Sequence, residues 1–302
     1  MARMNNTGPG GAPDRVGLAE LAAMKRERRP IVMVTAYDHP SASLADSAGV
    51  DIVFTGDSAA NNVLGYADTT PISMDEMLML ARAARRGTHR AFFMADLPLG
   101  AFQVSDEDAV RNAVRLVKEA GAEAVKIEGA GPMVSRARAI ASAGIPVMGH
   151  IGLTPQTATM LGGHKAQGRT GAKARQLYAD ALALQAAGCF AIVLEAVPDR
   201  VAARITEALR IPTIGIGAGA SCSGQVLVWH DLLGVNEGWA PKFVKRFADV
   251  AGETRRGLEA FAAEVRAGTY PADEHAYHIT DAEYALFESE TAPGVLVADD
   301  WL

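Results

Sequence analysis

The sequence predicts a single α/β domain of the (β/α)8 barrel class. Short apolar runs recur along the chain, helical patterns separate them, and no change in composition divides the chain. The runs do not alternate with polar residues, as is typical of parallel strands buried on both faces. Strands that alternate with helices indicate one parallel sheet. The seven predicted strands cover residues 31–36, 51–56, 91–96, 123–129, 145–150, 189–195 and 211–217.

Helical patterns fill the longest intervals between these runs. We expect helices within residues 74–87, 105–122 and 171–188. Ser73 and Ser105 precede the first two, and each is followed by acidic residues on the first turn. A serine in this position accepts a hydrogen bond from the free backbone N–H groups, and acids there complement the helix dipole.

An eighth unit is needed to close the barrel. We predict its strand near residues 238–247 (GWAPKFVKRF) and its helix from about Glu253 to Ala267. A doubly wound open sheet is the alternative fold. The catalytic barrel then spans residues 17–278, preceded by a polar, Gly/Pro-rich leader at 1–16 that we expect to be disordered. Residues 279–302 contain six acids and no Lys or Arg, so we interpret them as an acidic C-terminal extension.

The composition narrows the classes of partner. With 29 basic and 35 acidic residues the formal charge is -6, which argues against nucleic acid or an anionic membrane surface. No apolar run approaches the length of a membrane span or a signal sequence. Cys189 and Cys222 show no metal-binding spacing, which favours a reducing compartment. These features predict a cytoplasmic enzyme that acts on a small molecule.

The predicted strands end in polar residues, and barrel active sites form at those ends. A single acid after a strand often caps the next helix, but the whole set indicates a site. Three carboxylates at one end of an apolar barrel repel each other unless a cation neutralises them, and hard oxygen ligands favour Mg²⁺. We therefore predict a divalent metal at Asp57, Asp96 and Glu128. The strand-end residues are Asp57, Ser58, Asp96, Lys126, Glu128, His150 and Glu195.

Two of these residues share a strand. Lys126 and Glu128 are two positions apart, so both side chains point to the same face. This places the ammonium beside a predicted metal ligand, although a simple salt bridge inside the barrel is the alternative. Glu195 comes from a strand opposite the metal-bearing ones, where it is placed to act as a base on bound substrate.

Two loops carry weaker signals. The glycine-rich residues 214–225 resemble a dinucleotide loop, but Ala220 stands at the third glycine position, so a tight turn or a phosphate cradle is the better interpretation. The basic stretch 161–170 (LGGHKAQGRT) indicates a mobile lid.

The order of the motifs resembles the ketopantoate hydroxymethyltransferase family. The resemblance extends over about residues 17–278 with little change in spacing. It rests on the following stretches: GDS at 56, VLGYADTTPISMDEML at 63, ADLPLGAFQ at 95, VKIEG at 125, GHIGLTPQ at 149, GGHKAQG at 162, VLEAVP at 193, IPTIGIGAG at 211, GQVLVWHDLLG at 224 and PKFVKRF at 241.

The resemblance implies a chemistry and residues for it. It implies transfer of a one-carbon unit from methylenetetrahydrofolate to 3-methyl-2-oxobutanoate, which forms 2-dehydropantoate in pantothenate synthesis. Asp57, Asp96 and Glu128 would bind Mg²⁺. Ser58 and Lys126, with Asp57 and Asp96, would hold the 2-oxo acid, and Glu195 would accept a proton that His150 helps to relay. The family also implies a barrel of the phosphoenolpyruvate and isocitrate lyase group and a homo-oligomer, a ring-like decamer.

The chain departs from the family in two places. Ala59, Ala60, Asn61 and Asn62 stand where the family has Leu-Gly-Met and an apolar residue, and Ser223 stands where it has Asp. Amides near a pocket must find hydrogen-bond partners, so Asn61 and Asn62 are expected beside the substrate groups. This favours, as an alternative, a paralogue that uses a more polar 2-oxo acid or another one-carbon donor. A carbon–carbon lyase or phosphonate mutase with a reactive cysteine, and a barrel without catalysis, are further alternatives.

Overall fold

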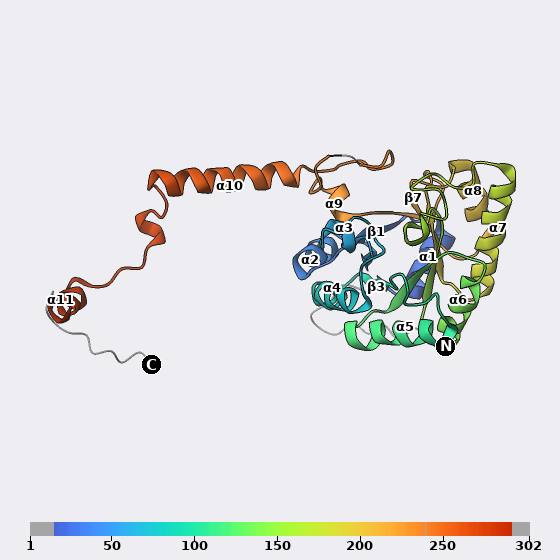
Figure 1. Ribbon diagram of the computed structural model, residues 1–302, viewed down its shortest axis with the longest axis horizontal. Helices are drawn as coiled ribbons and strands as arrows, with labels where there is room; N and C mark the ends of the chain where they lie inside the picture. The colour runs from blue at the N-terminus through green and yellow to red at the C-terminus, as the bar shows by residue number, and fades with distance from the viewer. Residues whose placement is uncertain (1–14, 239, 292–302) are drawn as a thin grey trace. The chain divides into compact units, whose positions relative to one another are not determined.

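The computed structural model describes residues 15–238 and 240–291. Eight parallel strands pair in chain order, and β8 pairs with β1 to close the barrel (Figure 1). The fold class predicted from the sequence is therefore confirmed, and the open sheet is excluded. The strands are β1 Ile31–Thr35, β2 Ile52–Thr55, β3 Phe92–Asp96, β4 Ala124–Glu128, β5 Val147–Gly152, β6 Ala191–Glu195, β7 Thr213–Ile216 and β8 Gly224–Leu227.

Helices surround the strands in Figure 1. The predicted helix 74–87 is confirmed at its bounds, and its Ser73 forms a capping box with Glu76. Ser105 likewise caps α5 by accepting from the backbone N–H of Asp108. The helices are α1 Leu18–Glu27, α2 His39–Ser47, α3 Ala59–Asn62, α4 Met74–Gly87, α5 Asp106–Ala120, α6 Met133–Ser142, α7 Gly171–Ala186, α8 Asp199–Ala208, α9 Trp229–Leu232, α10 Val250–Ala267 and α11 Asp281–Glu290.

Apolar side chains fill two layers. One cluster lies inside the barrel and includes Met33, Phe54, Met94 and Val193. A second, larger cluster joins the outer faces of the strands to the helices. Because every strand has apolar neighbours on both faces, the strand sequences are continuous apolar runs and do not alternate between apolar and polar residues.

The predicted eighth strand at 238–247 is wrong. The barrel closes with β8 at Gly224–Leu227, while the described residues around Pro241 form turn and loop. The connection from β7 to β8 is only residues 217–223 and contains no helix, so the strand–helix rhythm breaks there. The predicted helix that follows exists as α10, but it does not follow a barrel strand directly.

The glycine-rich stretch 214–225 is thus mostly the link between two strands. It comprises the end of β7, the short link and the start of β8. Ser223, one of the departures from the family, lies at the amino end of β8, where its backbone N–H donates to Oγ1 of Thr213. This end of the strand is opposite the mouth, so Ser223 stabilises the pairing of β7 and β8 and stands away from the carboxylates.

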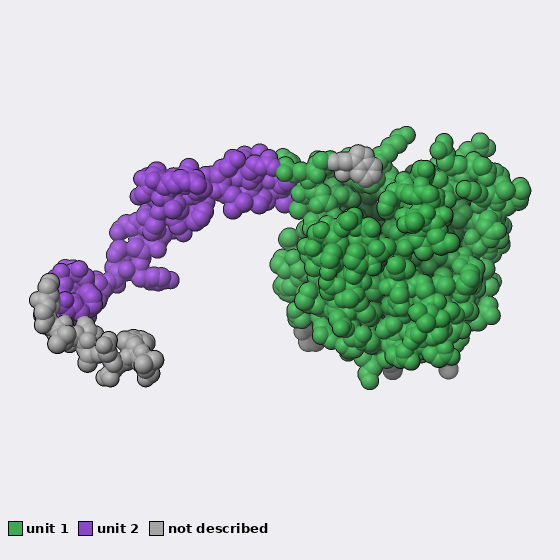
Figure 2. Space-filling model, viewed as in Figure 1, with its two compact units in different colours: residues 1–249 green, residues 250–302 purple. Residues whose placement is uncertain are grey.

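The contacts divide the chain into two compact units, residues 1–249 and 250–302 (Figure 2). The barrel belongs to the first unit. Val16, which we assigned to the leader, is buried and donates its N–H to Arg90 O, whereas residues 1–14 lie outside the described residues, as does the end of the acidic extension at 292–302. Within the described ranges, no helix has both the length and the apolar character needed to cross a membrane.

Candidate active site

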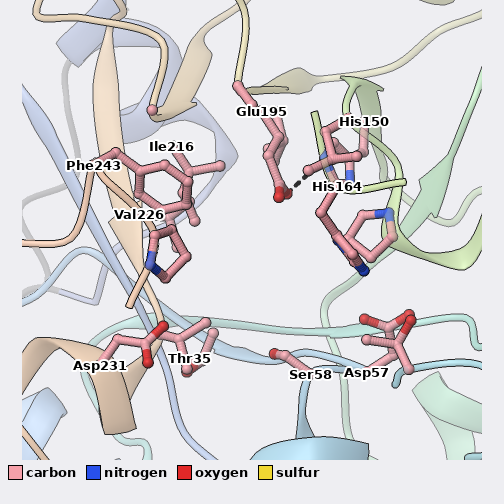
Figure 3. Close-up of a pocket in the computed structure, with 18 of the residues that line it drawn as sticks. Thr35, Asp57, Ser58, His150, His164, Glu195, Ile216, Val226, Asp231 and Phe243 are labelled. Atoms are coloured by element: carbon pink, nitrogen blue, oxygen red, sulfur yellow. Dashed lines mark ion pairs between the residues drawn. The ribbon is translucent and has the colours of Figure 1, made fainter. Parts of the chain in front are cut away.

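A cavity of about 1030 Å³ opens at the carboxyl ends of the barrel strands. All residues that the sequence analysis placed at strand ends line it, together with Asn61 and Asn62 (Figure 3). Asp57 and Ser58 follow β2, Asp96 ends β3, and Glu195 ends β6. Lys126 and Glu128 lie on β4, and His150 lies on β5. The barrel therefore brings together side chains that are up to 138 positions apart because parallel strands end at one edge.

Buried charges meet at the base of this cavity. Lys126 Nζ lies 2.8 Å from Asp96 Oδ1 and 3.7 Å from Glu128 Oε1. His150 lies between two acids, with Nδ1 3.2 Å from Glu128 Oε1 and Nε2 3.2 Å from Glu195 Oε2. The salt bridge that we weighed for Lys126 and Glu128 is present, but it is one contact of a larger network that reaches Glu195.

Gln156 is a site residue that the sequence analysis missed. It is buried in the turn after β5, and its Nε2 donates to Asp57 Oδ2 at 2.8 Å while its backbone N–H donates to Glu128 Oε2 at 3.0 Å. It thereby fixes two predicted metal ligands at once. The quoted motif GHIGLTPQ contains it, but a glutamine after a strand carries no signal of its own.

The cluster contains more negative charge than the protein neutralises. Burial, followed by the charges of Asp96 and Glu128, raises the pKa of Asp57 well above its usual value of 3.8. Burial also opposes the charge of Glu128, but His150 and Lys126 outweigh it and lower the pKa of that carboxyl. Burial also raises the pKa of Asp96 despite the charge of Lys126, so the conflict falls on Asp57 and Asp96.

The acids around His150 favour the protonated form of its imidazole. Burial and the charge of Lys126 both lower its pKa, yet Glu128 and Glu195 outweigh them and raise the pKa to about 9. The imidazole lies between the carboxylate cluster and Glu195, and Lys126 Nζ lies 3.2 Å from its Nδ1.

The donor set fits a divalent cation. Asp96 Oδ1 is buried beside Lys126 without a well-aligned hydrogen bond, so this oxygen retains a free lone pair. Over the described ranges, no three His, Cys, Asp or Glu side chains already converge as a metal-binding group. Carboxylate oxygens are the hard ligands that Mg²⁺ prefers, and the ion keeps several of its waters and so uses few protein ligands.

Ser58 is held by a second residue that the sequence analysis missed. Tyr37, buried just after β1, lies with its hydroxyl 2.9 Å from Ser58 Oγ. Burial raises the pKa of Tyr37, so the phenol stays protonated and has an O–H to share. Its ring packs against that of His230, with centroids 5.5 Å apart. From the sequence alone, an aromatic residue after an apolar strand is indistinguishable from core.

The two amides next to Ser58 differ in their surroundings. Asn62 donates through Nδ2 to Ser58 O at 2.7 Å and accepts through Oδ1 from Asn236 Nδ2 at 2.5 Å. Asn62 therefore joins the segment after β2 to the segment after α9. Asn61 also lines the cavity and is exposed.

The segment that we had predicted as the eighth strand covers part of the mouth. Phe243 packs on Gly217 at the end of β7, where an added Cβ would lie 2.6 Å from the phenyl ring and where φ is +65°. A side chain at position 217 would displace Phe243. The stretch 161–170 supplies His164 and Lys165 to the same cavity, and its Gln167 donates its backbone N–H to Ala196 O after β6.

Comparison with known proteins identifies relatives over most of the chain. The family model described as "Ketopantoate hydroxymethyltransferase" matches residues 15–273. The 3-methyl-2-oxobutanoate hydroxymethyltransferase of Moorella thermoacetica is 54% identical over 263 residues, which are 87% of this chain and 98% of that protein. The enzyme of the same name from Acidothermus cellulolyticus is 50% identical over 265 residues, or 88% and 97% of the two chains.

Solved structures share the fold at much lower identity. Phosphonopyruvate hydrolase in complex with oxalate and Mg²⁺ aligns with a TM-score of 0.56 at 14% identity and covers 91% of this chain and 98% of that one. The 2,3-dimethylmalate lyase of the PEP mutase/isocitrate lyase superfamily aligns with a TM-score of 0.55 at 16% identity, over 90% and 98%. At these identities the neighbours show that the barrel fold is shared. The family match and the close relatives together show that this chain belongs to the ketopantoate hydroxymethyltransferase family.

Proposed function

We propose that this protein transfers the one-carbon unit of 5,10-methylenetetrahydrofolate to 3-methyl-2-oxobutanoate in a Mg²⁺-dependent reaction that forms 2-dehydropantoate. The observation that carries the proposal is the placement of Glu195. It faces the cavity at the end of β6, and His150 connects it to the buried carboxylates (Figure 3). A base outside the cation-binding cluster, but next to it, is what proton removal from a bound 2-oxo acid requires.

Asp57, Asp96 and Glu128 would hold the Mg²⁺. When bound, the ion supplies a positive charge that stabilises the enolate of the 2-oxo acid. Gln156 keeps two of these carboxylates oriented through its side chain and its backbone N–H. Lys126, which is nearly fully buried, adds an ammonium next to the substrate oxygens.

Glu195 removes the proton from C3 of the substrate. Its carboxylate is partly exposed to the cavity, so it can reach a bound ligand, and His150 Nε2 lies 3.2 Å from its Oε2. Ser58 is placed to donate to the substrate carboxylate, and the Tyr37 hydroxyl fixes its rotamer. Lys126 balances the negative charge that develops on the C2 oxygen when the C3 proton leaves.

The carbanion then forms the new carbon–carbon bond. Its C3 bonds to the methylene carbon of the folate, both bonds from that carbon to N5 and N10 break, and a water molecule supplies the hydroxyl of the product. The other proton of that water and the proton taken from C3 end on the two folate nitrogens. The folate leaves as tetrahydrofolate, so no oxidant or reductant is consumed.

Product formation tests the proposal. The purified protein is incubated with 3-methyl-2-oxobutanoate, methylenetetrahydrofolate and Mg²⁺, and 2-dehydropantoate is measured by mass spectrometry. We expect stoichiometric formation of 2-dehydropantoate and tetrahydrofolate. Absence of product from folded protein that binds Mg²⁺ would refute the proposed reaction.

Asn61 supports a second candidate, a family member with a more polar 2-oxo acid or another one-carbon donor. Asn62 has protein partners, so this alternative now depends on Asn61, which lines the cavity and is exposed. Rates of product formation with a series of 2-oxo acids distinguish the two candidate functions. A preference for the branched, apolar acid would exclude a family member specific for a more polar one.

The cysteines give no support to a lyase with a reactive thiol. Burial raises the pKa of Cys189 to about 12, and the residue lies at the amino end of β6. Burial also raises the pKa of Cys222, which precedes the amino end of β8. A nucleophilic cysteine needs a lowered pKa and access to the substrate.

A further inference from the structure

The cavity has two chemically different halves. The half formed by β2 to β6 carries the charged network that the proposed reaction uses. The other half is bounded by apolar side chains of β7, β8 and the segment after α9. Figure 3 shows Ile216, Val226 and Phe243 on one side of the view and His150, His164 and Asp57 on the other. A cavity of about 1030 Å³ is at the upper end of the roughly 300–1,000 Å³ typical of sites for drug-sized ligands, and far exceeds the needs of a five-carbon acid.

The apolar wall is pre-formed. Val226 is buried, Ile216 packs against the same cluster, and Phe243 rests on the bare backbone of Gly217. An aromatic side chain over a flat apolar surface is suited to a planar ring of the ligand, which it contacts face or edge on.

Asp231 provides the polar group of this half. It lies on α9, lines the cavity, and in Figure 3 stands on the same side as the apolar wall, near Thr35. Its Oδ1 is 3.4 Å from Asn236 Nδ2, a long contact that leaves acceptor capacity on both oxygens. It takes no part in the ion pairs around Lys126, so the proposed proton transfer and cation binding do not account for it.

Two lysines stand where the cavity meets solvent. Lys165 comes from the stretch 161–170 and Lys242 from the segment that carries Phe243, and both side chains are on exposed residues. In the described ranges neither ammonium makes an ion pair of 4.0 Å or less. Four acids of the network and Asp231 line the same cavity, so these lysines offset a field that would otherwise repel an anionic ligand.

We propose that this half of the cavity binds the folate, with Asp231 on the pterin and with Lys165 and Lys242 on the glutamyl carboxylates. The inference rests on the proposed function and assigns residues to its second substrate. The pterin ring presents an amino group and an adjacent ring N–H, two donors that one carboxylate accepts together. The wall of Ile216, Val226 and Phe243 covers the flat ring system. The charged tail then extends to the rim, where the lysines meet it in solvent.

Binding of tetrahydrofolate tests this without turnover. Calorimetric titrations compare tetrahydrofolate carrying one glutamate with tetrahydrofolate carrying three, for the wild type, Asp231→Asn and the double variant Lys165→Met/Lys242→Met. Lys118→Met, an exposed lysine on α5, is the matched control. Melting temperatures verify that each variant is folded.

We expect Asp231→Asn to weaken both ligands by about tenfold or more, since a charged acceptor of two hydrogen bonds is lost. The wild type should bind the triglutamate more tightly than the monoglutamate at low salt, with a difference that shrinks as salt is added. The double lysine variant should lose that difference, and Lys118→Met should keep it.

The inference is overturned if Asp231→Asn binds both ligands as tightly as the wild type, or if the triglutamate preference is absent or survives in the double lysine variant. Failure of the proposed function looks different. The wild type would then not exchange the C3 proton of 3-methyl-2-oxobutanoate with Mg²⁺ present, a reaction that needs no folate.

Discussion

At the scale of single residues, Lys126 determines the charge balance of the site. Its ammonium contacts Asp96 and lies over the ring of Phe54, 5.4 Å from the centroid, while the charges of Asp96, Glu128 and Asp57 raise its pKa despite burial. It is therefore always charged and neutralises part of an acidic cluster that a divalent cation completes. Removal of one partner from such a buried network leaves an uncompensated charge, which typically costs about 3–5 kcal/mol.

Replacing Lys126 should increase the dependence of the fold on Mg²⁺. We expect Lys126→Met to melt below the wild type without the ion and to gain more in melting temperature when Mg²⁺ is added, because its carboxylates have lost the ammonium that neutralises part of their charge. Asp96→Asn should respond less to Mg²⁺ than the wild type, since it has lost a ligand. Thermal unfolding with and without Mg²⁺ measures both. Equal Mg²⁺ responses in all three proteins would contradict cation binding by these carboxylates.

The charged residues of the site could be predicted from the sequence, whereas their neutral partners could not. Asp57, Asp96, Glu128 and Glu195 each follow an apolar run, and that position alone puts them at the mouth of a barrel. Gln156 lies in a turn whose path depends on the tertiary structure, so its two hydrogen bonds to the carboxylates have no local signal.

At the scale of elements, the links after β7 and β8 shape the cavity. The βα pattern predicted seven strands, but β8 was missed because only residues 217–223 separate it from β7 and because it begins with glycine. The apolar residues of segment 238–247 suggested a strand, but Pro241 interrupts the segment. Phe243 instead forms part of the cavity wall. Asn62 then attaches this region to the segment after β2.

The contact between Asn62 and Asn236 should stabilise the fold. We expect Asn62→Ala and Asn236→Ala each to lower the free energy of unfolding by about 1 kcal/mol, and the double variant to lose less than the sum, because both changes break the same hydrogen bond. Asn61→Ala, one position earlier and exposed, should stay within about 0.5 kcal/mol of the wild type. Denaturant unfolding measures all four. Full additivity would show that the two amides act independently.

At the scale of the whole molecule, the second unit exposes an apolar stripe. Leu258, Phe261 and Val265 lie three and four positions apart on α10, so they share one face of the helix, and their exposed fractions are 63%, 55% and 47%. Exposed apolar surface of this kind is typical of a protein interface. It supports the homo-oligomer implied by the resemblance, which we propose for this chain.

Light scattering tests the assembly. We expect the wild type to have a mass several times that of one 31.7 kDa chain, about ten times for a decamer. Leu258→Glu/Phe261→Glu should reduce that mass, because a charge in the interface must be desolvated, whereas Glu259→Gln should not change it. A monomeric wild type would exclude the oligomer, and an unchanged mass in the double variant would exclude this face as the interface.

Exchange of the C3 proton tests the central claim, that Glu195 is the base of a Mg²⁺-dependent enolisation. The protein is incubated in D₂O with 3-methyl-2-oxobutanoate and Mg²⁺ but without folate, and the loss of the C3 proton signal is followed by NMR. The wild type should exchange the proton, and Glu195→Gln should be slower by about 10²–10⁴-fold while its melting temperature still rises with Mg²⁺ as in the wild type. Exchange at the wild-type rate in Glu195→Gln, or no exchange in the wild type, would contradict the account.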